Sequence, residues 1–375
     1  MKNFNIKITI SIFFIFSLFT CNVKQSTENS SDSNDDLATF TLFNEILFYD
    51  GYAETVDEPV PTGIYRISNS KYVSKLTEEN IKKIGDKLYL EIIVKAACDN
   101  YDRIGNVFLS LANKGDNYDK NILISTIELA RFITPFMDKN KTPNQVPYKF
   151  EINNIAKILN DPEISSKYDF WIEFDIFGVP YTANTQISSC AGKNYTFYGT
   201  LKLVSSQQSK DTFKQIFVPI ASFVSFNNYK DTDVLGQTTR SFNIEIPSST
   251  KNAKLYLITS NHGYNAGGEE YNRRIHNIYF DGNFIDSYIP GGKSCEPFRE
   301  YNTQANGIYG ATPRTDSEWA SFSNWCPGDV IPIRIFDLGN LNSGNHTFKI
   351  EVPDAEFVDS QGDIPLSAYI QGDEL

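Results

Sequence analysis

The segment from Cys98 to Arg103 carries the residues with the clearest chemical potential in this sequence. It reads Cys-Asp-Asn-Tyr-Asp-Arg, so two acids and an arginine stand close to a cysteine. Paired carboxylates can activate water and protonate a leaving group, which is general acid and base catalysis. A lone Asp-Arg neighbour pair is more often a surface ion pair with little effect. The segment is therefore a candidate site that needs support from the rest of the chain.

The residues before this segment predict a strand that would position it. Apolar and polar residues alternate from Leu88 to Val94, so Leu88, Leu90, Ile92 and Val94 share one face. A loop at the end of a strand is held by a rigid sheet, and such loops often carry reactive side chains. The polar run after Cys98 is expected at this strand end.

A second acidic cluster is predicted on the strand from Phe170 to Ile176. Alternation with a period of two buries the four apolar residues and places Trp171, Glu173 and Asp175 together on the opposite face. An aromatic ring beside carboxylates is typical of a sugar site. The alternative is an ordinary solvated face, which the pattern alone favours.

The third informative stretch runs from Ser260 to His276. It is rich in glycine and ends in two acids, Glu269 and Glu270, and two arginines before a predicted strand. Glycine lets the backbone approach a ligand closely. A plain connection with solvated charges is the alternative, and the stretch alone favours it. The three histidines are not spaced as metal ligands, and no nucleophile elbow occurs.

Length and composition predict two β-rich domains. The chain has 375 residues, 28 of them Phe and 21 Tyr, and its short apolar runs are separated by Gly, Pro, Asn and Ser. Short helices are predicted only near 75–84 and 153–160. A polar break at 207–210 places the boundary between domains at 38–208 and 209–375. Whether each domain is a sandwich or a jelly roll stays open at this point. The net charge of -12 excludes a nucleic-acid partner, because no basic field can replace phosphate counterions.

The N-terminus has the features of an export signal. Lys2 and Lys7 precede an apolar run over 8–19 that is too short to span a bilayer. The sequence Leu-Phe-Thr-Cys ending at Cys21 resembles a bacterial lipobox, so residues 1–21 are expected to be a lipoprotein-type signal peptide. Residues 22–37 are rich in Ser, Asn and Asp and predict a flexible tether. We expect an exported protein, either a periplasmic, outer-membrane-anchored lipoprotein or a secreted protein.

Four further cysteines remain, an even number that favours disulfides in an exported protein. Three pairings are possible. We favour Cys98 with Cys190 and Cys295 with Cys326, because each pair lies in one half of the chain.

The motifs together resemble the peptide:N-glycosidase F family. The resemblance rests on the segment from Cys98 to Arg103, the Asn106-Val107 pair, Arg-Phe-Ile-Thr-Pro-Phe over 131–136, and Asn-Trp-Cys-Pro-Gly over 324–328. It covers about Lys87 to Gln371 and keeps the order of the motifs.

This resemblance implies a fold, an activity and a set of site residues. The fold is all-β, with two antiparallel eight-stranded jelly rolls side by side and the site between them. The activity is an amidase that releases N-linked glycans from glycoproteins or glycopeptides and converts Asn to Asp, without cofactor or metal, in a monomer. The implied catalytic carboxylates are Asp102, Glu173 and Glu270, and the implied substrate-binding residues are Arg103, Trp171, His262, Tyr271 and Trp325.

Three positions depart from the family pattern. The family's first cysteine before the Asp102 loop is missing, its arginine four residues before the Trp-Cys-Pro-Gly cysteine is Phe322, and its tryptophan two residues after the Glu173 position is Asp175. These differences touch substrate contacts. A glycan-binding surface lipoprotein of the same fold, without turnover, therefore stays as the alternative function.

The lipobox predicts that Cys21 is lipidated. Radiolabelled palmitate should be incorporated into the wild-type chain in its bacterial host and not into Cys21→Ala. Absence of label from both proteins would indicate ordinary secretion instead.

Overall fold

The computed structural model describes residues 37–206, 214–230, 233–263, 268–304 and 308–375. The predicted signal peptide, Cys21 and almost all of the predicted tether lie outside these residues. The strands are β1 (Leu37–Tyr49), β2 (Ile64–Ser68), β3 (Lys71–Lys75), β4 (Leu88–Ala96), β5 (Ile104–Asn113), β6 (Ser125–Ile133), β7 (Gln145–Glu151), β8 (Tyr168–Ile176), β9 (Tyr195–Ser206), β10 (Gln215–Phe226), β11 (Thr239–Ile246), β12 (Thr250–Thr259), β13 (His276–Phe280), β14 (Asn283–Tyr288), β15 (Val330–Ile331), β16 (Arg334–Leu341), β17 (Gly344–Glu351) and β18 (Ile364–Glu374). The helices are α1 (Glu78–Lys82), α2 (Asn153–Asn160), α3 (Pro162–Lys167), α4 (Ala183–Gln186) and α5 (Asp316–Ala320), with 3₁₀ turns η1 (Glu296–Tyr301) and η2 (Val358–Ser360).

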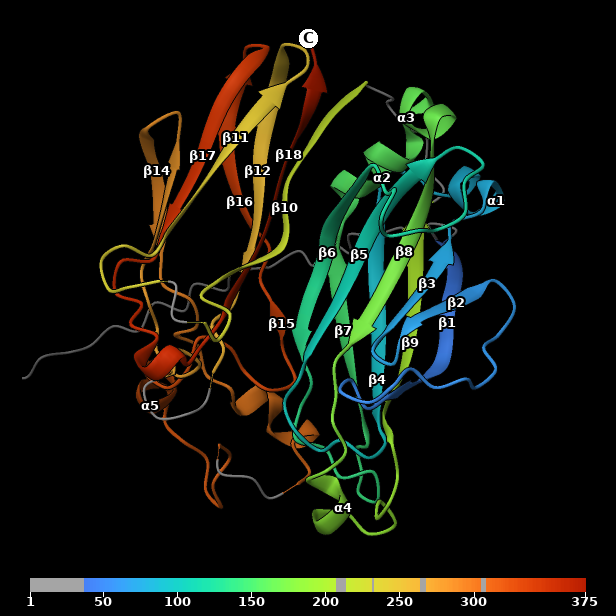
Figure 1. Cartoon of the computed structure of the whole chain (residues 1–375), viewed down its shortest axis with the longest axis vertical. Helices are drawn as coiled ribbons and strands as arrows, with labels where there is room; N and C mark the ends of the chain where they lie inside the picture. Colours follow the sequence, from blue (N-terminus) through green and yellow to red (C-terminus); the bar gives the residue numbers. More distant parts are fainter. Residues whose placement is uncertain (1–36, 207–213, 231–232, 264–267, 305–307) are drawn as a thin grey trace, which may run out of the picture. The chain divides into compact units, whose positions relative to one another are not determined.

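The first half of the chain forms two antiparallel sheets (Figure 1). One has the strand order β1-β9-β4-β7 and the other the order β15-β6-β5-β8-β3-β2. The alternation predicted for β4 is present, because Leu88, Leu90, Ile92 and Val94 are fully buried. They pack in one core with side chains of the second sheet, such as Phe174. The polar segment from Cys98 to Arg103 therefore starts just beyond the end of a well-packed strand.

The second half forms two more antiparallel sheets, β10-β18-β12-β16 and β11-β17-β13-β14, around a separate core. The exception is β15, whose two residues pair with β6 of the first half, Val330 opposite Phe132 and Ile331 opposite Arg131. This short strand joins the C-terminal half to the N-terminal half by pairing with the first two residues of the segment 131–136.

The predicted all-β fold with two antiparallel domains is confirmed. In the described residues the C-terminal domain has its eight strands, while the N-terminal sheets hold nine of their own and β15. The domain boundary between residues 208 and 209 lies in the undescribed stretch 207–213 and stays a prediction; β9 ends at Ser206 and β10 begins at Gln215. None of the described helices is long and apolar enough to cross a membrane.

Both expected disulfides are present, Cys98–Cys190 and Cys295–Cys326. Cys98 and Cys190 are fully buried beside Ala183 of α4, so this bridge fastens the segment leading into Asp102 to a second loop.

A buried ion pair lies where the two domains meet. Arg131 donates to both carboxylate oxygens of Glu128, at 2.8 and 2.7 Å, and neither side chain is exposed. Arg131 also reaches the C-terminal domain, donating to Ser260 Oγ at 2.9 Å and to the Pro365 carbonyl at 2.8 Å. Ser367 in turn donates to Glu128. Both members of the ion pair thus bond to residues of the C-terminal domain, so this network holds the two domains in one relative position.

We expect Arg131→Met to lower the free energy of unfolding by about 3–5 kcal/mol, because it leaves the Glu128 carboxylate buried without its counter-ion. The double variant Glu128→Met/Arg131→Met should recover part of this loss, since no charge then remains buried. Urea unfolding measures both.

The control is Lys167→Met, which removes an exposed pair with Glu163 and should cost less than about 1 kcal/mol. An Arg131→Met protein as stable as this control would contradict the role given to the buried pair.

Candidate active site

A cleft of about 1,240 Å³ lies between the sheet β2-β3-β8-β5 of the first domain and loops of the second. Its walls combine aromatic rings with carboxylates and a few cations. Asp102, Arg103, His262, Glu270 and Tyr271 line it, together with Phe322 and Asp175, two of the three positions that depart from the family pattern. The structure thus brings five of the eight predicted catalytic and substrate-binding residues to one cavity.

Asp99 fixes the shape of the loop that presents Asp102. Its buried carboxylate accepts hydrogen bonds from Arg103 Nε at 2.7 Å, from the Val179 backbone N–H at 2.7 Å and from the Tyr101 backbone N–H at 3.0 Å. The Arg103 guanidinium is therefore held by Asp99 while still lining the cleft. Sequence analysis treated Asp99 only as part of the motif and missed this role.

Thr134 holds the same loop from the neighbouring strand. Its hydroxyl accepts from the Arg103 backbone N–H at 2.7 Å and donates to the Tyr101 carbonyl at 2.9 Å. Its own backbone N–H donates to the Arg103 carbonyl at 2.8 Å. The motif over 131–136 thus contributes Arg131 to the domain interface and Thr134 to the support of the loop that carries Asp102.

Asp102 itself is poorly solvated. It is half-buried, and its Oδ2 atom is buried with no hydrogen-bond partner among the described residues. Burial raises the pKa of Asp102 well above its usual range, and the charge of Glu270 raises it further, while Arg103 opposes the shift. Such a carboxyl group can hold a proton at a pH where a solvated aspartate would be ionised.

Glu270 approaches Asp102 from the C-terminal domain. Its Oε2 accepts from the Gly263 backbone N–H at 3.3 Å, and the Tyr271 hydroxyl also donates to its side chain. Its backbone carbonyl accepts from Asn324 Nδ2 at 2.5 Å, so the residue before Trp325 helps to place it. Burial raises the pKa of Glu270, while these donors and Arg103 oppose the shift. The two carboxyl groups therefore titrate as a pair.

Glu173 lies beside the cleft and does not line it. It is buried on the predicted polar face of β8, where it accepts from Ser110 Oγ, from the Tyr118 hydroxyl at 2.8 Å and from Lys71 Nζ at 3.0 Å. Lys71 also lies 3.5 Å from Asp175, and these two do line the cleft. Burial raises the pKa of Asp175 to about 6. Glu173 can thus act on a ligand only through Lys71 and Asp175.

Trp171 lies away from the cleft, which corrects the expectation that it contacts the sugar. It is 3% exposed and packs with Val73 and Ala112, with Tyr65 and Tyr118 against its ring. The solvated face favoured by the pattern of β8 is also wrong, since Glu173 is as deeply buried as Trp171. The reason is that the segment after β5 covers this face, with Tyr118 against Trp171 and Glu173, while Tyr65 of β2 in the same sheet packs beside the Trp171 ring. Neither contact was predicted.

His262 and Trp325 form a stacked pair, of which only His262 lines the cleft. Their ring centroids are 5.8 Å apart, and Trp325 Nε1 donates to the Asn261 carbonyl at 2.8 Å. The His262 Nε2 atom lies 2.7 Å from Ser260 Oγ, the group that Arg131 also contacts. Burial, with the nearby Arg131 charge, lowers the pKa of His262 to about 3. His262 is therefore neutral at physiological pH, and Trp325 serves as its support.

Two cleft residues escaped sequence analysis because they stand in no motif. Asp363 pairs through its backbone with His262, and its Oδ1 atom is buried without a partner among the described residues. Burial raises the pKa of Asp363 to about 6. Tyr229, which also lines the cleft, lies near both Asp363 and Glu270.

The raised pKa of Asp102 predicts how stability depends on pH. Folded protein binds this proton more tightly than unfolded protein, so the contribution is favourable below about pH 4 and is lost as pH rises through the folded-state pKa. Asp102→Asn removes the buried charge and should be more stable than wild type at pH 8, by about 1–3 kcal/mol. Urea unfolding at pH 4 should show a much smaller difference.

Asp57→Asn, at an exposed carboxylate, is the matched control and should leave stability unchanged at both pH values. A stability gain in Asp102→Asn that was equal at pH 4 and pH 8 would contradict the raised pKa.

Comparisons with known proteins agree with this architecture. The family profile described as "Peptide-N-glycosidase F, N terminal" matches residues 39–193, and the one described as "Peptide-N-glycosidase F, C terminal" matches residues 228–371. A curated relative is peptide-N(4)-(N-acetyl-beta-D-glucosaminyl)asparagine amidase F of Elizabethkingia miricola, which is 24% identical over 274 residues, 68% of this chain. The chain spans 62% of the length of that relative.

Two solved structures have the same fold. PNGF-II superposes with a TM-score of 0.64 at 21% identity, covering 90% of this chain and 66% of its own. PNGase F of Flavobacterium meningosepticum, described as a glycosylasparaginase, superposes with a TM-score of 0.55 at 16% identity, covering 90% of this chain and 96% of its own. With both halves matched by the family profiles, the chain belongs to the peptide-N-glycosidase F family.

Proposed function

We propose that this protein hydrolyses the amide bond between asparagine and the first N-acetylglucosamine of an N-linked glycan, converting that Asn to Asp. Membership of the family supports a glycoamidase-type function. The single observation that carries the finer proposal is the pairing of Asp102 with Glu270, two poorly solvated carboxyl groups that come from different domains and face the same cleft.

The pair suits the two demands of amide hydrolysis. An amide is a poor electrophile with a poor leaving group, so the site must direct water to the carbonyl carbon and give the departing nitrogen a proton. Two coupled carboxyl groups whose environments differ can divide these tasks. We assign the proton to Asp102, whose Oδ2 lacks a donor, and the charge to Glu270, which accepts hydrogen bonds from Gly263 and Tyr271.

In this scheme Glu270 orients the water and Asp102 contacts the scissile linkage. Water adds to the amide carbonyl carbon, the C–N bond breaks, and the glycosylamine leaves with the proton from Asp102. The proton released by the water returns to the pair, which restores the starting state. Arg103, fixed by Asp99, stabilises the negative charge on the pair and orients Asp102.

The remaining predicted residues act around this centre. His262, Tyr271 and Arg103 line the cleft and would contact the substrate. Lys71 and Asp175 would bind sugar hydroxyls, and Glu173 would hold Lys71 in place through their ion pair. The cleft of about 1,240 Å³ exceeds the usual 300–1,000 Å³ of a small-molecule site, as expected for a glycan joined to a peptide. N-glycosylated proteins or glycopeptides are thus the proposed substrates.

Export completes the proposal. Two disulfides fit an oxidising compartment, where glycoproteins from outside the cell are also found. We propose a monomer that is secreted or tethered at the outer membrane through lipidated Cys21.

Asp102→Asn is the test of the amidase. Acid and base assistance is worth about 10²- to 10⁴-fold, so kcat for glycan release from a denatured glycoprotein should fall by at least about 100-fold. Binding of a glycopeptide should persist, because the side chain keeps its shape. Mass spectrometry of the peptide should find Asp in place of Asn after wild-type treatment.

Asp57→Asn again serves as the control and should release glycan at the wild-type rate. Wild-type turnover by Asp102→Asn would exclude the assigned role, and a peptide that kept one sugar would indicate an endoglycosidase.

The alternative function is glycan binding without turnover. It is favoured by Phe322, which packs against Tyr271 at 5.6 Å between ring centroids, at the position where the family pattern has an arginine. If the wild type bound glycopeptide and left Asn unconverted, this alternative would replace the amidase.

A further inference from the structure

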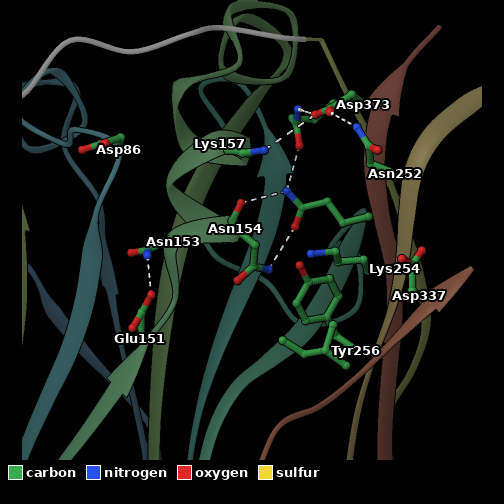
Figure 2. Close-up of a pocket in the computed structure, with 14 residues that line it drawn as sticks. Asp86, Glu151, Asn153, Asn154, Lys157, Asn252, Lys254, Tyr256, Asp337 and Asp373 are labelled. Atoms are coloured by element: carbon green, nitrogen blue, oxygen red, sulfur yellow. Dashed lines mark hydrogen bonds and ion pairs between the residues drawn. The ribbon is translucent and has the colours of Figure 1, made fainter. Parts of the chain in front are cut away.

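A second cavity, of about 780 Å³, lies at the other side of the domain interface. Figure 2 shows Asn153, Asn154 and Lys157 projecting from the α2 side, and Asn252, Lys254 and Tyr256 of β12 with Asp337 of β16 on the other. We call it the polar groove and define it by its lining residues, Asp86, Glu151, Asn153, Asn154, Lys157, Gln215, Asn252, Lys254, Tyr256, Ile335, Asp337, Gln371, Gly372 and Asp373. None of these residues lines the candidate active site.

The floor of the polar groove is a built network of buried amides. Gln371 accepts from Asn154 Nδ2 at 3.0 Å and donates to the Asn154 carbonyl at 2.8 Å and to Gln215 Oε1 at 2.9 Å. Gln215 donates to Asp373 Oδ1 at 2.9 Å. Gln371, Gln215 and Asp373 are each less than 8% exposed. Because each side chain is held by its neighbours, a ligand would meet donors and acceptors that are already ordered, which lowers the entropic cost of binding.

The chemistry of the walls excludes several ligand classes. Eleven of the fourteen residues carry a carboxylate, a carboxamide or an ammonium group, which suits hydroxyls that both donate and accept. Four carboxylates face two lysines, so phosphates and other anions are disfavoured. Burial opposes ionisation of Asp373, but hydrogen bonds from Gln215 and Asn252 and the charge of Lys157 outweigh it and lower the pKa of Asp373, so the floor carries a negative charge at neutral pH.

One apolar spot interrupts the polar wall. Tyr256 stands opposite Ile335 in the pairing of β12 with β16, and Ile335 is 55% exposed. The Tyr256 ring is itself fixed by stacking on Tyr369, with centroids 4.7 Å apart and planes 2° apart. Tyr369 is held in turn by Asn154 at 2.8 Å. Tyr256 is only 8% exposed, so Ile335 supplies most of the apolar surface and the Tyr256 ring is the fixed support behind it. A small apolar spot among amides suits a sugar ring, which has apolar C–H surfaces as well as hydroxyls.

We propose that the polar groove is a second carbohydrate-binding site, which takes a neutral oligosaccharide. Its volume of about 780 Å³ lies within the range of ligand sites and would admit several sugar units, because the groove is open. A peptide would need more apolar anchors than Tyr256 and Ile335 provide. The site shares no residue with the catalytic cleft, so the proposal stands whether or not the protein is an amidase.

Calorimetric titration of the full chain tests this site. The probes are mannohexaose and cellohexaose as neutral sugars, hexagalacturonic acid as an anionic one, and an uncharged hexapeptide. At least one neutral hexasaccharide should bind, and the acidic sugar and the peptide should bind at least about tenfold more weakly. The variant Lys254→Ala/Asp337→Ala removes two exposed polar groups from the rim. It should lower the affinity for the neutral sugar by about tenfold, which is the effect of losing one or two hydrogen bonds.

Lys120→Ala/Asp57→Ala removes the same two charges from exposed positions outside both cavities and should bind like wild type. A second variant, Asn154→Leu, removes the amide that bonds to Tyr369 and Gln371 in the floor and should also weaken sugar binding. Thermal unfolding verifies that this variant is folded. Equal affinity of the rim variant and wild type would place the sugar elsewhere, in the cleft, and overturn the proposal. Binding of no neutral sugar, or stronger binding of the acidic sugar or peptide, would overturn it as well.

Discussion

The buried pair of Glu128 and Arg131 is the interaction on which the candidate site depends. Asp102 belongs to one domain and Glu270 to the other, so their coupling requires a fixed relation between domains. Arg131 supplies it through Ser260 and the Pro365 carbonyl, and Ser260 also contacts the His262 ring. A buried ion pair is costly unless fully hydrogen-bonded, and here each charged group has partners on both sides of the interface. Arg131 therefore has two roles. It links the two domains, and its charge adds to the effect of burial in keeping His262 neutral.

Sequence patterns predicted the strands and helices whose own alternation or periodicity of apolar residues is clear. The alternation in β4 and the helix over 153–160 are of this kind. β3 and β18 carry weaker local signals, because β3 has only five residues and β18 ends in a polar run that is nevertheless buried. The burial of Trp171 and Glu173 could not be predicted for a related reason: a period of two tells which residues share a face but not whether other segments cover that face.

The two carboxylates of the candidate site could be named from motifs, whereas the residues that support them could not. Asp102 and Glu270 stand in recognisable segments, but the roles of Asp99 and Thr134 depend on hydrogen bonds to Val179 and Tyr101 that spacing does not reveal. Lys71 and Asp363 reach the cleft only through tertiary packing. Family resemblance therefore pointed to the candidate carboxylates, and the geometry identified the groups that hold them and shift their pKa values.

The Cys98–Cys190 bridge gives the site a dependence on cellular compartment. Cys98 directly precedes Asp99, and its partner belongs to the loop after α4, so the bridge restrains the chain that carries the Asp99–Arg103 pair. In the reducing cytosol this restraint is absent. A chain with both cysteines reduced would therefore lack this restraint on the Asp99–Arg103 loop, and the loop would gain it only in an oxidising compartment.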